Sequence, residues 1–365
     1  MFLGLYEPIF SAPMRNLSSL VAAFGIALTL AACSSQDDGG SPESVPPTTN
    51  SGTGTEDPIT GTGGPTSGGS SGAVGGGGTP GPDLANVQKR KAQMLTSFWE
   101  NDTTVFQYAF SRNNNDGYGY TSGRVGFTTA TGDSSEVVDC FVAAYTGTGN
   151  LMKKYAAALK ALRDKMLQSG QMQPNLATID AIGNYNADWT ATANSAVTGP
   201  AFNGCQDERV DLTYWAPTLP IMKKWGLSTA LTRASIYDAM VVHGEDSVNN
   251  LAKQANSDTG NGAQKAAVAA LAQTAESEWL KAFHIRRVAL LNSSTAWRPA
   301  IARGANYEQM RRDGNFAFTA KIVTSATANT VFPGNNYPSN GYQACVINPD
   351  GTVSGVAQCT APVSN

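Results

Sequence analysis

The sequence predicts a mainly α-helical fold that contains a small antiparallel β-sheet. Four long stretches carry apolar residues at helical spacing or contain few helix breakers, namely residues 87–99, 151–167, 229–241 and 263–291. Residues 116–129 have a different texture, since glycines and aromatic residues there are bounded by turn residues, which is typical of a short hairpin or small sheet. The chain shows no strand–helix–strand alternation, so a parallel sheet is not expected.

The first helix is expected over residues 87–99, where Met94, Leu95, Phe98 and Trp99 recur at the spacing of a buried helix face. The second is expected over residues 151–167, which are rich in Ala, Leu and Lys.

Ser228 and Thr229 are residue types that cap helix N-termini, so the third helix should start there and run through Val241. The fourth covers residues 263–291.

Composition excludes several classes of protein. Of 365 residues, 41% are hydrophobic and 15% charged, and the overall charge is −3. Residues 83–365 hold 24 basic and 22 acidic side chains, without the strong basic surface of a nucleic-acid-binding protein. The two histidines, His243 and His284, are too few for a His-rich metal site, and no P-loop or H-E-x-x-H motif occurs. We therefore expect no nucleic-acid partner, no metal and no cofactor.

Residues 1–33 read as an export signal. Arg15 precedes a short apolar run, residues 20–30, which is followed by Ala-Ala-Cys33. Leu-Ala-Ala-Cys is also the bacterial lipobox pattern, in which Cys33 becomes acylated. An ordinary signal peptide with a chance cysteine is the alternative, and Met14 begins a more typical signal than the first methionine. The predicted location is extracellular or on the bacterial cell surface.

Residues 34–83 are predicted to be a flexible tether. In residues 34–82, 38 of the 49 residues are Gly, Ser, Thr or Pro, so they bury too little apolar surface to order the chain. A coil of this length spans ~40 Å. Residues 84–365 would form the folded body, expected to be a monomer that reaches a membrane only through its lipidated end.

Four cysteines remain in the body. An even number in an exported chain indicates two disulfides, for which three pairings are possible. We favour Cys345 with Cys359 across a short loop, which leaves Cys140 for Cys205. Zinc is the alternative, but the spacings include no C-x-x-C pair.

Two carboxylates are candidates for chemistry. Glu100 follows Phe98 and Trp99, and an acid beside aromatic rings loses hydration, which favours its protonated form. Asp116 lies in a polar turn, where it should stay ionised. Acids in two unlike environments are what glycoside hydrolysis requires, although any helix-end Glu and turn Asp would look the same.

The wider pattern resembles family 46 of the glycoside hydrolases, the chitosanases, over about residues 86–320; family 80 chitosanases are the related alternative. The first matching region contains Glu100-Asn101, Gln107-Tyr108, Asp116-Gly117, Gly119-Tyr120-Thr121, Gly126-Phe127-Thr128 and Thr131-Gly132-Asp133. The second contains Asp188-Trp189, Asp207-Glu208-Arg209, Ile236-Tyr237-Asp238-Ala239 and Val242-His243-Gly244.

The resemblance implies a lysozyme-like fold of two mainly helical lobes around a substrate cleft, with the small sheet in the first lobe. It makes Glu100 the general acid, Asp116 the base that activates water, and Thr121 a residue that holds this water. Asp133 would bind an ammonium group of the substrate. Asn101 and Tyr108, within the matched blocks, are counted as substrate-binding residues as well.

The resemblance also implies a buried acid–arginine network that supports the cleft, to which we assign Asp207, Arg209 and Arg287. Two positions depart from the family pattern. Tyr118 stands where an arginine is usual, and Arg112 lies in a segment that is often acidic. Because chitosan is a cation, both changes bear on subsite preference.

The expected function is endo-hydrolysis of chitosan, the β-1,4-linked polymer of glucosamine, by an inverting acid/base mechanism. A lysozyme-like lipoprotein that cleaves peptidoglycan is one alternative, and a non-catalytic surface lipoprotein that binds polysaccharide is another.

Overall fold

A computed structural model of the chain describes residues 86–260, 273–295, 298–324, 328–332, 337 and 344–360. The predicted export signal with Cys33, the predicted tether and the first part of the fourth predicted helix lie outside these residues.

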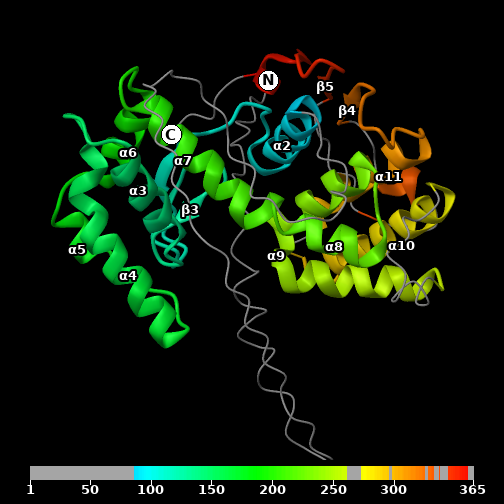
Figure 1. Ribbon diagram of the computed structural model, residues 1–365, viewed down its shortest axis with the longest axis horizontal. Helices are drawn as coiled ribbons and strands as arrows, with labels where there is room; N and C mark the ends of the chain where they lie inside the picture. Colours follow the sequence, from blue (N-terminus) through cyan, green and yellow to red (C-terminus); the bar gives the residue numbers. More distant parts are fainter. Residues whose placement is uncertain are drawn as a thin grey trace, which may run out of the picture. The chain divides into compact units, whose positions relative to one another are not determined.

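One group of helices packs together in the first half of the described chain (Figure 1). Within it, α3 contacts α4 and α7, and α6 contacts α7. Its members are α3 (Asp133–Ala144), a 3-10 turn (Leu151–Tyr155), α4 (Ala156–Ser169), α5 (Ala177–Asp180), α6 (Tyr185–Asn194) and α7 (Gly199–Val210). The second predicted helix is thus confirmed, as the 3-10 turn followed by α4.

A second group is built around α9 (Ala230–Asp258), which contacts α2 (Asn86–Asn101), α8 (Thr218–Trp225) and α10 (Gln273–Asn292). The group also includes a 3-10 turn (Arg298–Ala300), α11 (Ile301–Arg312) and α12 (Ala328–Val331). A π-helical turn, Asp211–Trp215, continues α7 toward α8, and in Figure 1 this run crosses from one group to the other. The structure is therefore mainly helical, as predicted.

Helix α9 forms the centre of the second group. Thr229 caps it, since the Thr229 Oγ1 accepts a hydrogen bond from the Thr232 amide at 3.3 Å, which confirms the predicted start. Every residue from Ala230 to His243 is buried. At Gly244 the backbone turns to φ 74°, and the helix continues in a new direction. The first half of α9 is thus a core helix, so a charged residue in it needs a partner inside the protein.

The predicted small sheet is present. It has the order β1-β2-β3, from Ser111–Asn113, Tyr120–Ser122 and Phe127–Thr128, and both pairings are antiparallel. Gly119 enters β2 with φ 74°, and a Cβ there would lie 2.2 Å from the Thr129 Oγ1. Only glycine fits this position without displacing a neighbour.

A second antiparallel sheet lies at the C-terminal end and was not predicted. Its order is β4-β5-β6, from Ile322–Val323, Cys345–Ile347 and Val353–Gly355, and another 3-10 turn, Ala357–Thr360, follows it. The described C-terminal residues, 344–360, are thus part of the folded body.

Both predicted disulfides are confirmed. Cys140 of α3 is bonded to Cys205 of α7, with their Cα atoms 5.8 Å apart. Cys345 is bonded to Cys359, with their Cα atoms 5.7 Å apart.

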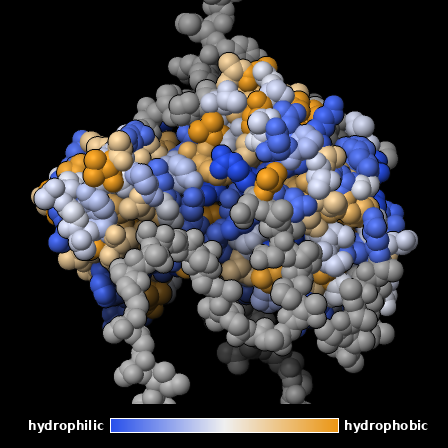
Figure 2. All heavy atoms as spheres, turned by 45° about the horizontal axis from the view of Figure 1, so that its top comes forward, coloured by the Kyte–Doolittle hydropathy of each residue, from blue (hydrophilic) through white to orange (hydrophobic). Residues whose placement is uncertain are grey.

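Among the described residues, no helix combines the length and apolar character needed to cross a membrane. On the face shown in Figure 2, hydrophobic residues are scattered spots among hydrophilic ones, which is ordinary for a folded surface.

Candidate active site

Glu100 lies in the last turn of α2, and its side chain is only 4% exposed. The Arg303 Nη1, from α11, donates a hydrogen bond to the Glu100 Oε1 at 2.7 Å. The rings of Phe98 and Trp99 pack edge to face just before it. The predicted aromatic surroundings are therefore present, but so is a guanidinium group, which favours the ionised carboxylate.

Asp238 of α9 holds Arg303 in place. The Arg303 Nε and Nη2 donate to the two Asp238 carboxylate oxygens at 3.0 and 2.8 Å, and the Arg287 Nη2 donates to Oδ2 at 2.6 Å. The Thr96 hydroxyl, on the same helix as Glu100, donates to the Asp238 Oδ1 at 2.8 Å. Because Asp238 occupies two of its nitrogens, Arg303 presents the third to Glu100 in a fixed direction.

This buried network contains two carboxylates and two guanidinium groups. Burial raises the pKa of Asp238, but the positive charges of Arg303 and Arg287 together lower it by more. The pKa of Asp238 is therefore lowered from its ordinary value. Burial likewise opposes the charge on Arg303, yet Asp238 and Glu100 outweigh it and the pKa of Arg303 is raised. Each of these groups therefore favours the charged form of the other.

Part of the predicted network is wrong. Arg287 belongs to it, but Asp207 forms an ion pair with Arg124, and Arg209 forms an ion pair with Glu136. The Asp207 side chain is 46% exposed. The physical reason is that residues two apart on a helix do not face the same way, so Asp207 and Arg209 of α7 meet different neighbours.

Sequence reasoning missed Asp238 as the central acid and missed Arg303 altogether. A signal was present for both. Each is a single charged residue within a run of apolar and small residues, residues 234–242 for Asp238 and 300–305 for Arg303. A charge in such a run must be paired when the run is buried, although the sequence does not show which charges pair.

Asp116 lies in the loop between β1 and β2 and is half-buried. The Asp116 Oδ1 accepts a hydrogen bond from the Tyr118 amide at 3.0 Å, and the preceding residue, Asn115, has a positive φ of 55°. The carboxylate is thus held by a tight polar turn.

Thr121 follows on β2, where it pairs with Arg112 on β1 and Thr128 on β3. Its side chain is buried, and the Thr121 Oγ1 has no hydrogen-bond partner among the described residues. A buried hydroxyl without a protein partner is commonly satisfied by an ordered water, so this position suits the predicted role.

Asp133 begins α3 and closes the turn after β3. The Asp133 Oδ1 accepts hydrogen bonds from the Thr128 amide, the Thr131 hydroxyl and the Ser134 amide at 2.5, 2.9 and 2.9 Å. Burial raises the pKa of Asp133 to about 6, although these bonds act in the opposite direction. Asp133 therefore orders its own turn through one oxygen, and its charge is sensitive to mildly acidic pH.

The two remaining candidates differ in whether their polar groups already have a hydrogen-bond partner. The Tyr108 hydroxyl donates to both carboxylate oxygens of Asp207, at 2.8 and 3.0 Å, so that hydroxyl is already engaged by the protein. The Asn101 Nδ2 is buried and has no hydrogen-bond partner among the described residues. Asn101 follows Glu100 directly and keeps a donor for a ligand.

A serine, a histidine and a glutamate also lie in a row. The Ser235 Oγ lies 2.8 Å from the His284 Nε2, and the His284 Nδ1 lies 2.9 Å from the Glu308 Oε2. This order matches a serine-hydrolase triad, but Ser235 and His284 are fully buried and Glu308 is 1% exposed. Burial also lowers the pKa of His284. Substrate cannot reach these residues, so they crosslink α9, α10 and α11.

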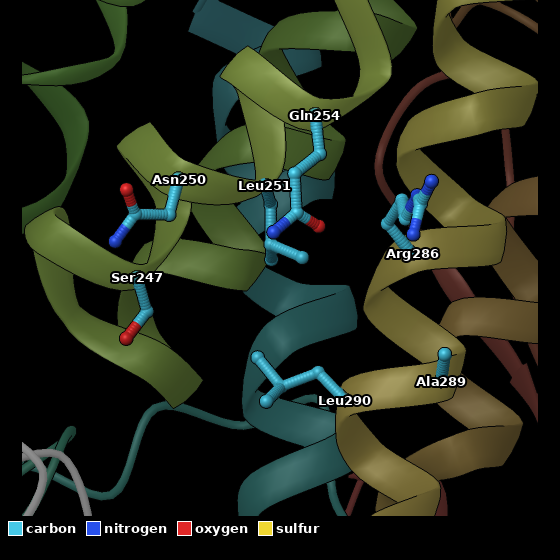
Figure 3. Close-up of a pocket in the computed structure, with 7 residues that line it drawn as sticks. All are labelled: Ser247, Asn250, Leu251, Gln254, Arg286, Ala289 and Leu290. Atoms are coloured by element: carbon cyan, nitrogen blue, oxygen red, sulfur yellow. The ribbon is translucent and has the colours of Figure 1, made fainter. Parts of the chain in front are cut away.

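A pocket of about 320 Å³ lies between α9 and α10 (Figure 3). It is lined by Ser247, Asn250, Leu251, Gln254, Arg286, Ala289 and Leu290. Arg286 is bound through two nitrogens to Asp258, both at 2.7 Å, so its charge is already compensated. None of the candidate catalytic residues lines this pocket. Within the described part of the chain, no cluster of three or more His, Cys, Asp or Glu could hold a metal ion.

Comparisons with known proteins agree on one family. Residues 94–322, which include Glu100 and Asp116, match the sequence profile of Glycosyl hydrolase family 46. A chitosanase of Bacillus subtilis (strain 168) is 33% identical over 249 residues, which cover 66% of this chain and 82% of that protein. A chitosanase of a Streptomyces species is 32% identical over 159 residues, 43% of this chain and 51% of that protein.

A crystal structure of a mutant chitosanase from Bacillus subtilis MY002, complexed with 6 GlcN, has the same fold. Its TM-score is 0.55 at 29% sequence identity, and the match covers 73% of this chain and 100% of that one.

Proposed function

Because the chain belongs to glycosyl hydrolase family 46, we propose that it is an endo-acting chitosanase that hydrolyses chitosan with inversion at the anomeric carbon. The observation that carries this proposal is the family match over residues 94–322, because it contains both candidate catalytic acids. The resemblance seen in the sequence supports the same activity.

In the proposed reaction Glu100, in its protonated form, gives its proton to the glycosidic oxygen as the bond to the anomeric carbon breaks. A water attacks that carbon from the opposite face of the ring, and Asp116 accepts the proton that this water loses. Such a pair needs ~6.5–9.5 Å between carboxyl groups to admit the water. The Thr121 hydroxyl, which has no hydrogen-bond partner among the residues that the structure describes, supports a water-holding role beside Asp116.

Arg303 has a defined part in this scheme. After proton donation Glu100 is a carboxylate in a nearly dry environment, and the Arg303 guanidinium 2.7 Å away stabilises that charge. Asp238 and Arg287 keep Arg303 oriented, so the stabilising charge does not have to move during the reaction.

The test uses Glu100→Gln and Asp116→Asn. Each should lower the rate of chitosan hydrolysis by about 10²–10⁴-fold, while a binding assay with glucosamine oligomers shows affinity within a few fold of wild type. NMR that resolves the anomers should show the inverted product first. Hydrolysis at near wild-type rate in Glu100→Gln would exclude Glu100 as the acid, and the retained anomer would exclude inversion. Clearing of cell walls without cleavage of chitosan would exclude the substrate.

We also propose that the enzyme is exported and anchored by a lipid on Cys33. The lipobox-like Leu-Ala-Ala-Cys sequence supports it, and so do two disulfides in the folded body, which are typical of oxidising compartments. Mass spectrometry of the mature N-terminus should find a diacylglyceryl-modified Cys33, and Cys33→Ala should release the enzyme from the membrane fraction. An unmodified N-terminus elsewhere in the chain would refute the anchor.

A further inference from the structure

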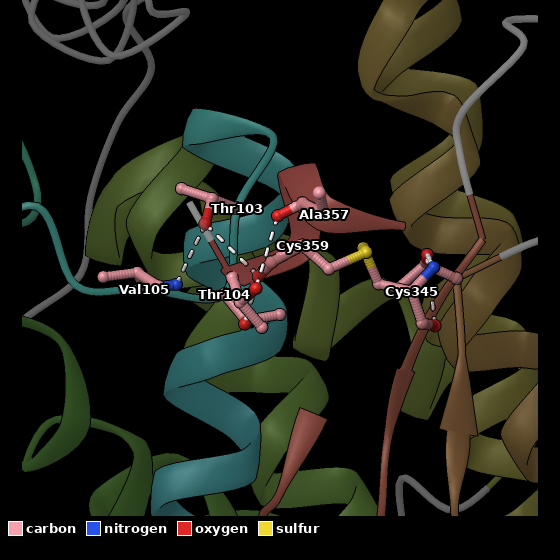
Figure 4. Close-up of a disulfide and its surroundings, with 8 residues drawn as sticks. Thr103, Thr104, Val105, Cys345, Ala357 and Cys359 are labelled. Atoms are coloured by element: carbon pink, nitrogen blue, oxygen red, sulfur yellow. Dashed lines mark hydrogen bonds between the residues drawn. A yellow bond between two sulfur atoms is a disulfide. The ribbon is translucent and has the colours of Figure 1, made fainter. Parts of the chain in front are cut away.

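The segment that follows Glu100 is held by the far end of the chain. The Cys359 carbonyl accepts hydrogen bonds from the Thr104 hydroxyl at 2.6 Å, the Thr104 amide at 3.0 Å and the Thr103 hydroxyl at 3.3 Å (Figure 4). Thr103, Thr104 and Cys359 are all buried. The backbone that leaves the helix of Glu100 is therefore bound to a carbonyl far along the chain.

Cys359 is itself fixed from two sides. Its disulfide joins it to Cys345 of β5 (Figure 4). The two sulfur-bearing residues pack with Phe98, which lies two positions before Glu100, in one small buried cluster. The C-terminal sheet and the 3-10 turn after it thus contact the end of α2 before Glu100 and the segment after Glu100.

The same sheet also binds the helix of Arg303. β5 pairs with β4, so Val346 lies beside Val323. The Asn306 Nδ2, from α11, donates to the Val323 carbonyl at 2.7 Å. Asn306 is three residues after Arg303, which is about one helical turn. The next residue after β4, Thr324, donates its amide to the Cys345 carbonyl at 3.0 Å.

These contacts form a closed path. It runs from Glu100 to Arg303, along α11 to Asn306, through β4 and β5 to the disulfide, and from Cys359 back to Thr104. The residues from 344 to 360, which we call the C-terminal clamp, lie beyond the range matched by the family profile, which ends at residue 322.

We propose that the C-terminal clamp positions Glu100 against Arg303, so that Cys359, Cys345 and Thr104 act as positioning residues for the general acid. The proposal rests on the function assigned above to Glu100. No residue of the clamp is proposed to touch substrate; the clamp acts by holding the two helix ends that carry the acid and its arginine.

Positioning of this kind affects rate more than binding. A displacement of about 1 Å in a reacting group can lower a rate ~10²-fold, while substrate contacts elsewhere in the site are unchanged. Loss of the clamp should therefore lower kcat and leave KM almost constant. A clamp that served stability alone would lower the melting temperature, with kcat unchanged below it.

The main test compares the two disulfides. Cys345→Ser/Cys359→Ser removes the clamp disulfide, and Cys140→Ser/Cys205→Ser is the matched control. Both are assayed on a defined glucosamine oligomer at a temperature where circular dichroism shows each variant folded. We expect the clamp variant to lose about 10-fold or more in kcat with KM within twofold of wild type, and the control to keep wild-type kcat.

A second test needs no change of cysteine. Thr104→Val removes one hydrogen bond to the Cys359 carbonyl, Thr104→Ser keeps it, and Thr360→Val makes the same change at an exposed neighbour of Cys359. We expect Thr104→Val alone to lower kcat severalfold, and Thr104→Ser to restore it.

The proposal is overturned if the folded clamp variant keeps wild-type kcat, or if both disulfide variants lose kcat equally. If the clamp variant does not fold, the Thr104 series decides, and wild-type kcat in Thr104→Val overturns the proposal. Glu100→Gln distinguishes failure of the proposed function from failure of the clamp proposal. Activity in Glu100→Gln would refute the role of Glu100 as the acid. An inactive Glu100→Gln together with clamp variants of wild-type kcat would refute only the role of the clamp.

Discussion

Replacing Arg303 by methionine removes the cation that joins Glu100 to Asp238 while keeping most of the side-chain volume. Three charge-assisted hydrogen bonds are lost, one to Glu100 and two to Asp238. Removing one partner of a buried ion pair destabilises a protein by about 3–5 kcal/mol. Asp238 keeps Arg287 and Thr96 as partners, so we expect the lower end, about 3 kcal/mol, which in a domain of this size lowers the melting temperature by about 6–12 °C.

The control is Arg286→Met. Arg286 also binds an aspartate through two nitrogens, both at 2.7 Å, but its side chain is 46% exposed. Solvent screens that pair, so its loss should change the melting temperature little. Thermal unfolding followed by circular dichroism measures both. Equal shifts in melting temperature in the two variants, or no shift in Arg303→Met, would refute the view that burial makes the Arg303 ion pairs contribute strongly to stability.

Three further predictions concern single positions. Because the pKa of Asp133 is about 6, its negative charge is lost as pH falls through 6. KM for glucosamine oligomers should therefore rise severalfold over that range, even though the substrate becomes more cationic. Asp133→Asn should show no such rise in KM. Thr121→Val should lower kcat by about 10²-fold without lowering stability, because the hydroxyl that it removes has no hydrogen-bond partner in the described part of the chain. Thr121→Ser should stay active, and a stability loss with wild-type kcat would contradict this prediction. Gly119→Ala should lower the free energy of unfolding, measured in urea, by about 2–4 kcal/mol, because φ is positive there and the new Cβ would lie 2.2 Å from Thr129. The control is Gly117→Ala, where φ is also positive but a Cβ would meet nothing within 4 Å. An equal loss in that variant would show that backbone strain alone is responsible.

The fold could be predicted where local signals decide it. The apolar spacing of residues 87–99 and the capping pair before α9 are properties of a few neighbouring residues, and both elements formed as expected. The C-terminal sheet gave no such signal, because its strands have two or three residues and β5 pairs with a strand some twenty residues earlier. Such short strands exist only through their tertiary contacts.

The residues of the candidate site also differ in how far the sequence could predict them. Glu100 and Asp116 could be proposed as candidates from the sequence because each lies in a short stretch that resembles the family pattern. The partner of Glu100 could not, since Arg303 lies about two hundred residues away along the chain. The resemblance assigned Asp207 and Arg209 to one network, but their side chains leave α7 in different directions and pair with Arg124 and Glu136 instead.

The distance along the chain between Thr103 and Cys359, 256 residues, has a consequence for biogenesis. The helix bearing Glu100 emerges from the ribosome well before its support, which is synthesised 256 residues later and contains a disulfide that needs an oxidant to form. A newly synthesised chain can thus bury much of its core before Glu100 is held in position. Activity should therefore appear later than folded structure does, once the disulfide between Cys345 and Cys359 has formed.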